Sequence, residues 1–231
     1  MLTLITYPAA FGTVSLSPFC VKAMYLLNAA KLDWQREDSS DPRRMPRAKL
    51  PVLRTPEELV HDSDGIRRYL EDHGADFLGG LSDRDRARSH AMIRMAEEHL
   101  YFLLLLDRWE RPEVWPSIRD TYFAEIPGLV RSWIGGGIRR RVLGGLKVQG
   151  IGRMTWDERM DRLDQDLAAI SGQLRNHGFL FREDPTLADC SVVAMLDAMR
   201  ATPAETPITR RIREDHRLNA YVDRGHAALA A

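Results

Sequence analysis

The stretch SPFC at residues 17–20 decides how the first part of the chain is interpreted. Serine is a favoured helix N-cap, and proline fits the first helical position because that position needs no N–H. Residues 2–7 form an apolar, alternating segment before this stretch, and residues 18–31 carry a broad apolar face after it. The sequence therefore predicts a buried strand, a loop and a helix that opens at Ser17.

The following segments predict the rest of a small α/β unit. The expected elements are a strand at 32–37, a short irregular helix within 38–49, a hairpin of strands at 51–55 and 58–61, and a helix at 64–73. Asp62 and Ser63 are capping residues for the last helix, and Gly74 marks its end. This order predicts a mixed sheet with helices packed against it.

From Ser82 onward the pattern is almost entirely helical. The expected segments are 82–109, 113–147 in pieces broken at 127–128 and 135–137, 155–177, and 190–200 opened by a capping box at 186–189, with shorter helices in the remainder. Residues 74–81 contain Gly79 and Gly80 and interrupt both the strand and helix pattern before them and the helical pattern after them. We therefore expect two domains, residues 1–76 and 82–231.

Charge gives no support for a nucleic-acid partner. The 231 residues include 33 Lys and Arg and 33 Asp and Glu, so the formal net charge is zero, whereas a nucleic-acid-binding protein needs a basic excess. Arginines cluster at 139–141 and 210–211, and we interpret both clusters as solvated helix faces.

Cysteine, histidine and hydropathy patterns give further expectations. Cys20 and Cys190 lie far apart, so no disulfide framework is expected, and the scattered histidines predict no metal site. The chain start lacks the pattern of a signal peptide, and the most apolar run, Leu100–Leu106, is far shorter than the roughly 20 residues of a membrane span. We expect a cytoplasmic protein without a membrane span.

Three motifs together resemble those of glutathione transferases. SPFC at 17–20 resembles the C-P-F/Y-C motif of thioredoxin-fold thiol proteins, with serine in the place of the attacking cysteine. KLPVL at 49–53 resembles the loop and cis-proline segment of glutathione transferases. Asp62 and Ser63, followed by Ile66, resemble the Glu/Gln-Ser-x-x-Ile motif of that family. The three motifs occur in the family's order on the predicted strand–helix–hairpin–helix frame.

The second half resembles the metaxin-like branch of the same superfamily, which includes the "failed axon connections" proteins. The matching stretches are EEHLYF at 97–102, RW at 108–109, QGIGR at 149–153, FLF at 179–181 and PTLAD at 185–189. The resemblance covers nearly the whole chain. It implies a thioredoxin-like N-terminal domain, a helical glutathione-transferase C-terminal domain and a homodimer.

The resemblance makes Ser17 the candidate catalytic residue. A free thiol has a pKa of about 8.5, and lowering it by about 1.5 units takes roughly 2 kcal/mol of stabilisation of the thiolate. A hydroxyl at a helix N-terminus can supply this. Ser17 as a plain N-cap is the alternative. Cys20, which would shift the chemistry toward thiol–disulfide exchange, Ser15 and Tyr7 are the fallback groups.

The same resemblance assigns the residues that bind glutathione and a second substrate. A cis Pro51 would expose the Leu50 backbone to the cysteinyl backbone of glutathione, beside Lys49. Ser63 at the helix start would bind the γ-glutamyl carboxylate, and Asp62, one methylene shorter than the usual Glu or Gln, its ammonium. Tyr101 and Trp109 would wall a pocket for an apolar co-substrate.

These expectations lead to two functional hypotheses. The first is a detoxifying glutathione transferase, in which glutathione is the co-substrate, no metal takes part, and the thiolate attacks an electrophile or a peroxide. The second is a non-catalytic binding or assembly protein with the same fold, since a fold does not guarantee its reaction.

Overall fold

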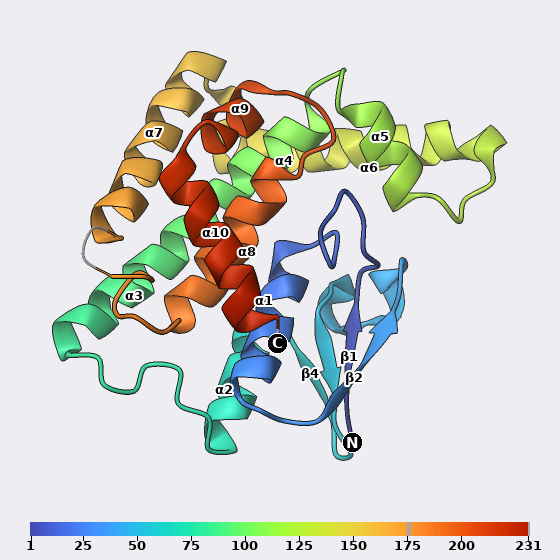
Figure 1. The fold of residues 1–231 in the computed structure, drawn as a ribbon. Helices are drawn as coiled ribbons and strands as arrows, with labels where there is room; N and C mark the ends of the chain where they lie inside the picture. Colours follow the sequence, from blue (N-terminus) through green and yellow to red (C-terminus); the bar gives the residue numbers. More distant parts are fainter. Residues whose placement is uncertain (175–176, 231) are drawn as a thin grey trace.

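The N-terminal part of the molecule, residues 1–72, is built on a four-stranded sheet (Figure 1). The computed structural model describes residues 1–174 and 177–230. The strands are β1 (Leu2–Thr6), β2 (Trp34–Asp38), β3 (Val52–Arg54) and β4 (Leu59–His61), in the order β2-β1-β3-β4. β1 pairs parallel with β2 and antiparallel with β3, and β3 pairs antiparallel with β4. The predicted mixed sheet is confirmed.

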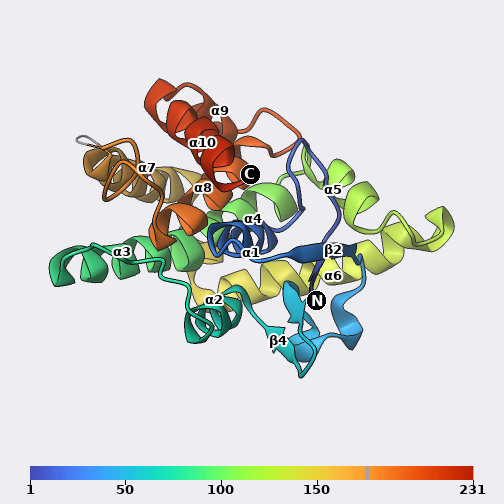
Figure 2. The same cartoon turned by 60° about the horizontal axis from the view of Figure 1, so that its bottom comes forward.

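Helix α1 (Pro18–Ala29) lies between the sheet and the helices of the C-terminal part (Figures 1 and 2). Nine of its twelve residues are buried, because a helix that is apolar almost all round fits only inside a protein. It contacts β1 and α2 (Ser63–Asp72) on one side, and α8 (Leu187–Arg200) and α10 (His216–Leu229) on the other. The predicted start of this helix is confirmed.

In the described residues that follow Leu81, all regular elements of the C-terminal part are helices. Its elements are α3 (Asp83–Met95), the π-helical segment η3 (Ala96–Leu100), α4 (Tyr101–Trp109), α5 (Trp115–Tyr122), α6 (Gly128–Gln149), the 3-10 helix η4 (Ile151–Arg153), α7 (Trp156–Gln173), α8 (Leu187–Arg200), α9 (Pro207–Arg213) and α10 (His216–Leu229). α3, η3 and α4 follow one another without a gap, which confirms the helix expected at 82–109. The expected end of the helix at 155–177 includes residues 175–176, which lie outside the described residues.

Helix α8 is the centre of the helical part. Thirteen of its fourteen residues are buried, and it contacts α1, α3, α9 and α10. The predicted capping box is present, with the Asp189 carboxylate accepting hydrogen bonds from the Thr186 N–H at 2.7 Å and the Thr186 hydroxyl at 2.9 Å. The Tyr221 hydroxyl of α10 donates to the same carboxylate at 2.8 Å, so the cap also fixes the last helix.

Helix α6 corrects one prediction. The expected break at 127–128 is confirmed, but the break expected at 135–137 is wrong, because α6 runs without interruption from Gly128 to Gln149. A Cβ at Gly135 would lie 3.2 Å from side-chain atoms of Arg119 and Phe123. The glycine therefore lets α5 and its following residue pack closely on α6, and this packing outweighs glycine's low helix propensity.

The contact between α8 and α10 gives a test of the fold. A Cβ at Gly225 would lie 2.5 and 2.7 Å from the two methyl groups of Val193. We expect Gly225→Ala to lower the free energy of unfolding by about 1–3 kcal/mol through overpacking, measured by urea denaturation. The control is Gly172→Ala in α7, where nothing lies within 4 Å; it is expected to raise stability by up to about 1 kcal/mol. Equal effects of the two variants would contradict this packing.

Candidate functional site

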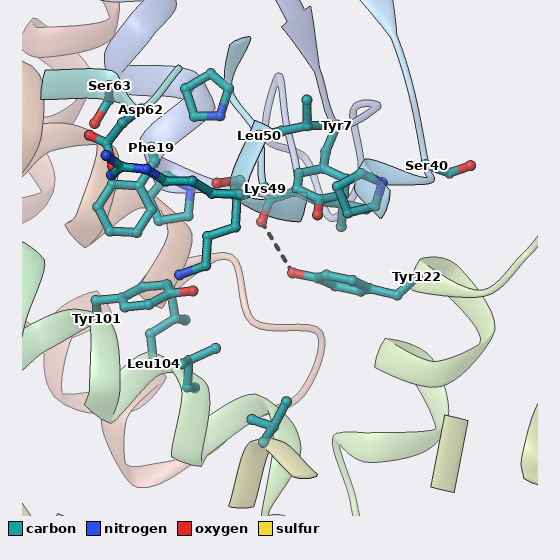
Figure 3. Close-up of a pocket in the computed structure, with 18 of the residues that line it drawn as sticks. Tyr7, Phe19, Ser40, Lys49, Leu50, Asp62, Ser63, Tyr101, Leu104 and Tyr122 are labelled. Atoms are coloured by element: carbon teal, nitrogen blue, oxygen red, sulfur yellow. Dashed lines mark hydrogen bonds between the residues drawn. The ribbon is translucent and has the colours of Figure 1, made fainter. Parts of the chain in front are cut away.

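A cavity of about 990 Å³ opens between the sheet part and helices α4, α5 and α6 (Figure 3). One wall comes from the sheet part and includes Tyr7, Leu16–Phe19, Ser40–Arg43, Pro46, Arg47, Lys49–Pro51 and His61–Asp64. The other wall comes from the helical part and includes Arg94, Glu97, Tyr101, Leu104, Leu105, Arg108, Trp109, Tyr122, Phe123, Ile134, Ile138 and Val142. Most of the residues predicted for the site thus line a single cavity.

Ser17 lies at the start of α1 and on the cavity wall. Its backbone is extended, with φ −108° and ψ 123°, and its side chain makes no capping hydrogen bond to α1. The alternative of a plain N-cap therefore does not describe this serine. The hydroxyl sits where the positive end of the helix dipole favours an anion in the cavity.

The residue before Ser17 is held by two donors from the helical part. Arg108 donates to the Leu16 carbonyl at 3.2 Å, and the Tyr122 hydroxyl donates to the same oxygen at 3.3 Å, the bond dashed in Figure 3. Arg108 also donates to the Ala198 carbonyl at 2.6 Å. These bonds fix the loop that presents Ser17 to the cavity.

Arg108 is a cation that the sequence did not reveal as part of the site. Its side chain is 2% exposed, and no carboxylate of the described residues forms an ion pair with it. Its partners are two carbonyls and the Thr202 hydroxyl, all neutral. A buried guanidinium on the cavity wall without a direct ion-pair partner among the described residues favours the ionised form of an acidic group bound nearby.

Cys20 and Ser15, two of the fallback groups, do not line the cavity. Cys20 is fully buried, and burial raises the pKa of its thiol, so it stays protonated at neutral pH. Ser15 is also buried and donates its hydroxyl to the Tyr7 carbonyl at 2.9 Å. Tyr7 does line the cavity, but burial raises the pKa of its phenol far above the usual range.

The Leu50–Pro51 peptide bond is cis, as the family pattern implied. Neither the N–H nor the C=O of Leu50 forms a hydrogen bond with any residue that the structure describes. Both residues line the cavity, so this backbone is free to pair with an extended peptide. Lys49, next to them, extends its side chain across the cavity toward Tyr101 (Figure 3).

Asp62 and Ser63 lie at the start of α2 and line the same cavity. Ser63 is buried, and within residues 1–174 and 177–230 neither its N–H nor its hydroxyl has a hydrogen-bond partner. The Asp62 carboxylate accepts the Asp64 N–H at 2.9 Å and so caps α2 with one oxygen. Asp62 also has φ +73° and ψ 140°, a strained conformation of the kind that persists at ligand sites.

The predicted aromatic residues form the inner wall of the helical part. The Tyr101 ring packs edge-on against Phe19, with centroids 4.8 Å apart, and Trp109 packs against Trp115 at 5.4 Å and Tyr122 at 5.8 Å. Burial raises the pKa of the Tyr101 phenol well above its usual value, so the phenol remains a hydrogen-bond donor at neutral pH.

Sequence reasoning missed the outer wall of the cavity, which comes from α6. Ile134, Ile138 and Val142 of this helix line the cavity. Their spacing of four residues places them on one helix face. That spacing is visible in the sequence, but the expected break at 135–137 hid it. These side chains make the part of the cavity far from the sheet apolar.

The described residues contain neither a cluster of metal ligands nor a membrane-spanning helix. Within residues 1–174 and 177–230, no group of three or more His, Cys, Asp or Glu is arranged to hold a metal ion. No helix in that same part of the chain combines the length and hydropathy needed to cross a membrane.

Two family models match the chain. The model of the glutathione S-transferase N-terminal domain matches residues 18–114, and that of the glutathione S-transferase C-terminal domain matches residues 163–225. The chain belongs to the glutathione S-transferase superfamily. The expected fold class, a thioredoxin-like sheet domain followed by a helical glutathione-transferase domain, is thereby confirmed.

Two curated relatives extend this glutathione S-transferase match. The chain is 26% identical over 217 residues to the isoprene-epoxide–glutathione S-transferase of Rhodococcus sp. (strain AD45). This match covers 89% of this chain and 89% of the Rhodococcus enzyme. It is 27% identical over 203 residues to Failed axon connections of Drosophila melanogaster. This match covers 80% of this chain and 47% of the Drosophila protein. The chain thus spans about half the length of the Drosophila protein and most of the Rhodococcus enzyme.

Solved structures share the fold at low sequence identity. The glutathione transferase GSTFuA3 from Phanerochaete chrysosporium superposes with a TM-score of 0.68 at 18% identity, over 98% of this chain and 96% of that one. The beta-etherase LigF from Sphingobium sp. strain SYK-6 gives a TM-score of 0.64 at 16% identity, over 98% of this chain and 95% of that one.

The strained backbone at Asp62 gives a test of the site. We expect Asp62→Gly to weaken glutathione binding while leaving stability unchanged or raising it by about 1 kcal/mol, because glycine adopts a positive φ without strain. The measurements are calorimetric titration and urea denaturation. The control is Asp215→Gly at the N-cap of α10, where φ is an ordinary −83° and a loss of a few tenths of a kcal/mol is expected. A larger stability loss at Asp62 than at Asp215 would refute the role of strain.

Proposed function

We propose that this glutathione S-transferase family member is an active transferase, with Ser17 stabilising the thiolate of bound glutathione. The observation that carries the proposal is the Ser17 side chain, which leaves its own helix uncapped and lines the cavity. The backbone of Leu50, and the N–H and hydroxyl of Ser63, have no hydrogen-bond partner among the described residues and lie on the same cavity wall. Ser17 thus offers a hydrogen-bond partner for the thiol, and Leu50 and Ser63 offer partners for the rest of the peptide.

Glutathione has groups that match each end of this wall. Its cysteinyl backbone pairs with the N–H and C=O of Leu50, and its γ-glutamyl carboxylate takes the N–H and hydroxyl of Ser63. The free oxygen of Asp62 receives the γ-glutamyl ammonium. The exposed cations Arg47 and Lys49 on the cavity rim receive the glycyl carboxylate.

Three features near the sulfur position favour the thiolate over the thiol. The Ser17 hydroxyl donates to the thiolate, the N-terminus of α1 contributes a partial positive charge, and the guanidinium of Arg108 donates to the Leu16 carbonyl nearby. A pKa lowered by about 1.5 units requires roughly 2 kcal/mol, which these contributions supply. The thiolate sulfur then bonds to an electrophilic carbon while that carbon's bond to its leaving atom breaks.

The apolar outer wall indicates the second substrate. Ile134, Ile138 and Val142 favour an apolar electrophile, and the phenol of Tyr101 can donate to an atom that becomes negative as its bond breaks. The Rhodococcus relative is named for an epoxide of this kind, isoprene epoxide. We propose a small apolar electrophile, with a peroxide as the other candidate, and a detoxifying homodimer in the cytoplasm.

A non-catalytic binding or assembly role is the second candidate. Failed axon connections, 27% identical over 80% of this chain, carries a name that describes no transfer reaction. The shorter Asp62, with one oxygen already capping α2, also favours weaker glutathione binding.

Glutathione binding separates the two candidates. At about 100 times the dissociation constant, a specific ligand adds about 2.7 kcal/mol to the free energy of unfolding. We therefore expect millimolar glutathione to raise the melting temperature in a thermal-shift assay. The thiol-free control peptide γ-glutamylalanylglycine reports binding of the peptide without the thiol. No shift with either peptide would favour the assembly role.

Ser17 and Cys20 variants then assign the chemistry. We expect Ser17→Ala to raise the pKa of the bound thiol by about 1 unit, so that transfer at pH 6.5 falls about tenfold and recovers as the pH rises. The measurement is the pH profile of kcat/KM with a chromogenic electrophile. Cys20→Ser is the matched control and is expected to leave the profile unchanged, since its thiol does not reach the cavity. A Ser17→Ala enzyme with the wild-type profile would remove Ser17 from the mechanism.

A further inference from the structure

The solvent-facing side of α6 exposes large apolar side chains. Leu129 is fully exposed, Val148 is 82% exposed and Trp133 is 78% exposed. At 100° per residue, these side chains share one side of the helix with Val130, Arg140, Arg141 and Lys147. We call these seven residues the outer face of α6; the cavity-lining residues of the same helix lie elsewhere on its circumference.

The outer face is strongly cationic. Helix α6 has five basic residues and no acidic residue. Side chains of Arg140, Arg141 and Lys147 form no hydrogen bond or ion pair with any described residue. The segment 119–149 holds six basic and two acidic residues, and one of the acids, Asp120, is bound by Arg119. Since the chain as a whole has no net charge, positive charge is concentrated here.

The fold places this face at the periphery of the molecule. In both Figure 1 and Figure 2, the beginning of α6 projects with α5 beyond the rest of the helical part. Leu129, Val130 and Trp133 lie in the first two turns of α6, within the projecting region. Apolar side chains on a projection reach a flat surface without obstruction from the rest of the protein.

We propose that the outer face of α6 docks on the surface of a bilayer that contains anionic lipids. An exposed tryptophan with neighbouring Leu and Val suits the interface between headgroups and acyl chains, and unpaired Arg and Lys suit anionic headgroups. A second copy of this chain fits less well, because a two-fold contact through this face would bring like charges together. The proposal does not depend on the proposed function, since the outer face does not line the cavity.

Vesicle binding tests this proposal. We expect the full chain to co-sediment with vesicles of phosphatidylcholine containing about 30% phosphatidylserine, to bind pure phosphatidylcholine weakly, and to dissociate at high salt. Arg140→Ala with Arg141→Ala is expected to weaken binding about 25-fold, at about fivefold for each charge. The control pair Arg84→Ala with Arg88→Ala on α3 removes the same charge from exposed positions elsewhere and is expected to bind as the unchanged chain does.

Tryptophan fluorescence reports how deeply Trp133 enters the bilayer. Brominated lipid in the anionic vesicles is expected to quench part of the emission, and Trp133→Ala is expected to abolish that quenching and to weaken binding about tenfold. Absence of binding to anionic vesicles, or equal binding by the α6 and α3 variants, would overturn the proposal. A dimer seen in analytical ultracentrifugation and dissociated by Trp133→Ala would also overturn it, because a second copy of the chain would then cover this face. A preference for RNA over anionic vesicles in a competition assay would overturn it as well.

Discussion

The ion pair between Lys22 and Glu97 constrains how the two parts of this protein meet. Lys22 is the only charged residue of α1, and its side chain is buried with that of Glu97, at an Nζ–Oε1 distance of 2.5 Å. The same Glu97 carboxylate accepts the Ser191 hydroxyl at 2.8 Å and pairs with Arg94 at 2.8 Å. Because a buried charge is costly unless it is paired and hydrogen-bonded, α1, η3 and α8 are held in one arrangement.

The candidate site depends on that arrangement. Ser17 comes from the sheet part, but the donors that hold its loop, Arg108 and Tyr122, come from the helical part. Glu97 itself lines the cavity, so the ion pair and the site share a wall. Arg108 is bonded both to the loop before α1 and to α8, so a shift of α1 against α8 would displace the Arg108 guanidinium and the Ser17 hydroxyl. The packing between the two parts of the protein therefore affects the electrostatics of the cavity.

Local signals made most of the fold and part of the site predictable from the sequence. The start of α1, the cap of α2 and the capping box at Thr186 depend on residues within four positions of one another. Such short-range patterns can be recognised from the sequence alone. The cis bond at Pro51 followed from family resemblance rather than from local chemistry. The domain limits at 76 and 82 remain predictions, because one hydrophobic core runs through both parts.

The remainder of the site depends on contacts between distant residues. Arg108 meets Leu16 across 92 positions of sequence, and no periodicity records such a contact. The accessibility of Ser15 and Cys20 depended on which way each side chain faces after folding. At Gly135, propensity and tertiary packing disagreed, and packing prevailed because α5 covers the glycine closely.

The glycines of α6 have a consequence for how molecules enter and leave the cavity. Six of its 22 residues are glycine, and each costs about 0.8–1 kcal/mol of helix stability relative to alanine. The helix is therefore sustained by its anchors, among them Arg139, which donates to the carbonyls of Trp109 and Glu110 at 2.6 and 2.8 Å. Its own helix propensity is therefore low for a helix of this length, and its stability depends on tertiary contacts. Local opening of this glycine-rich helix would widen the part of the cavity that Ile134, Ile138 and Val142 line, without displacing the sheet side.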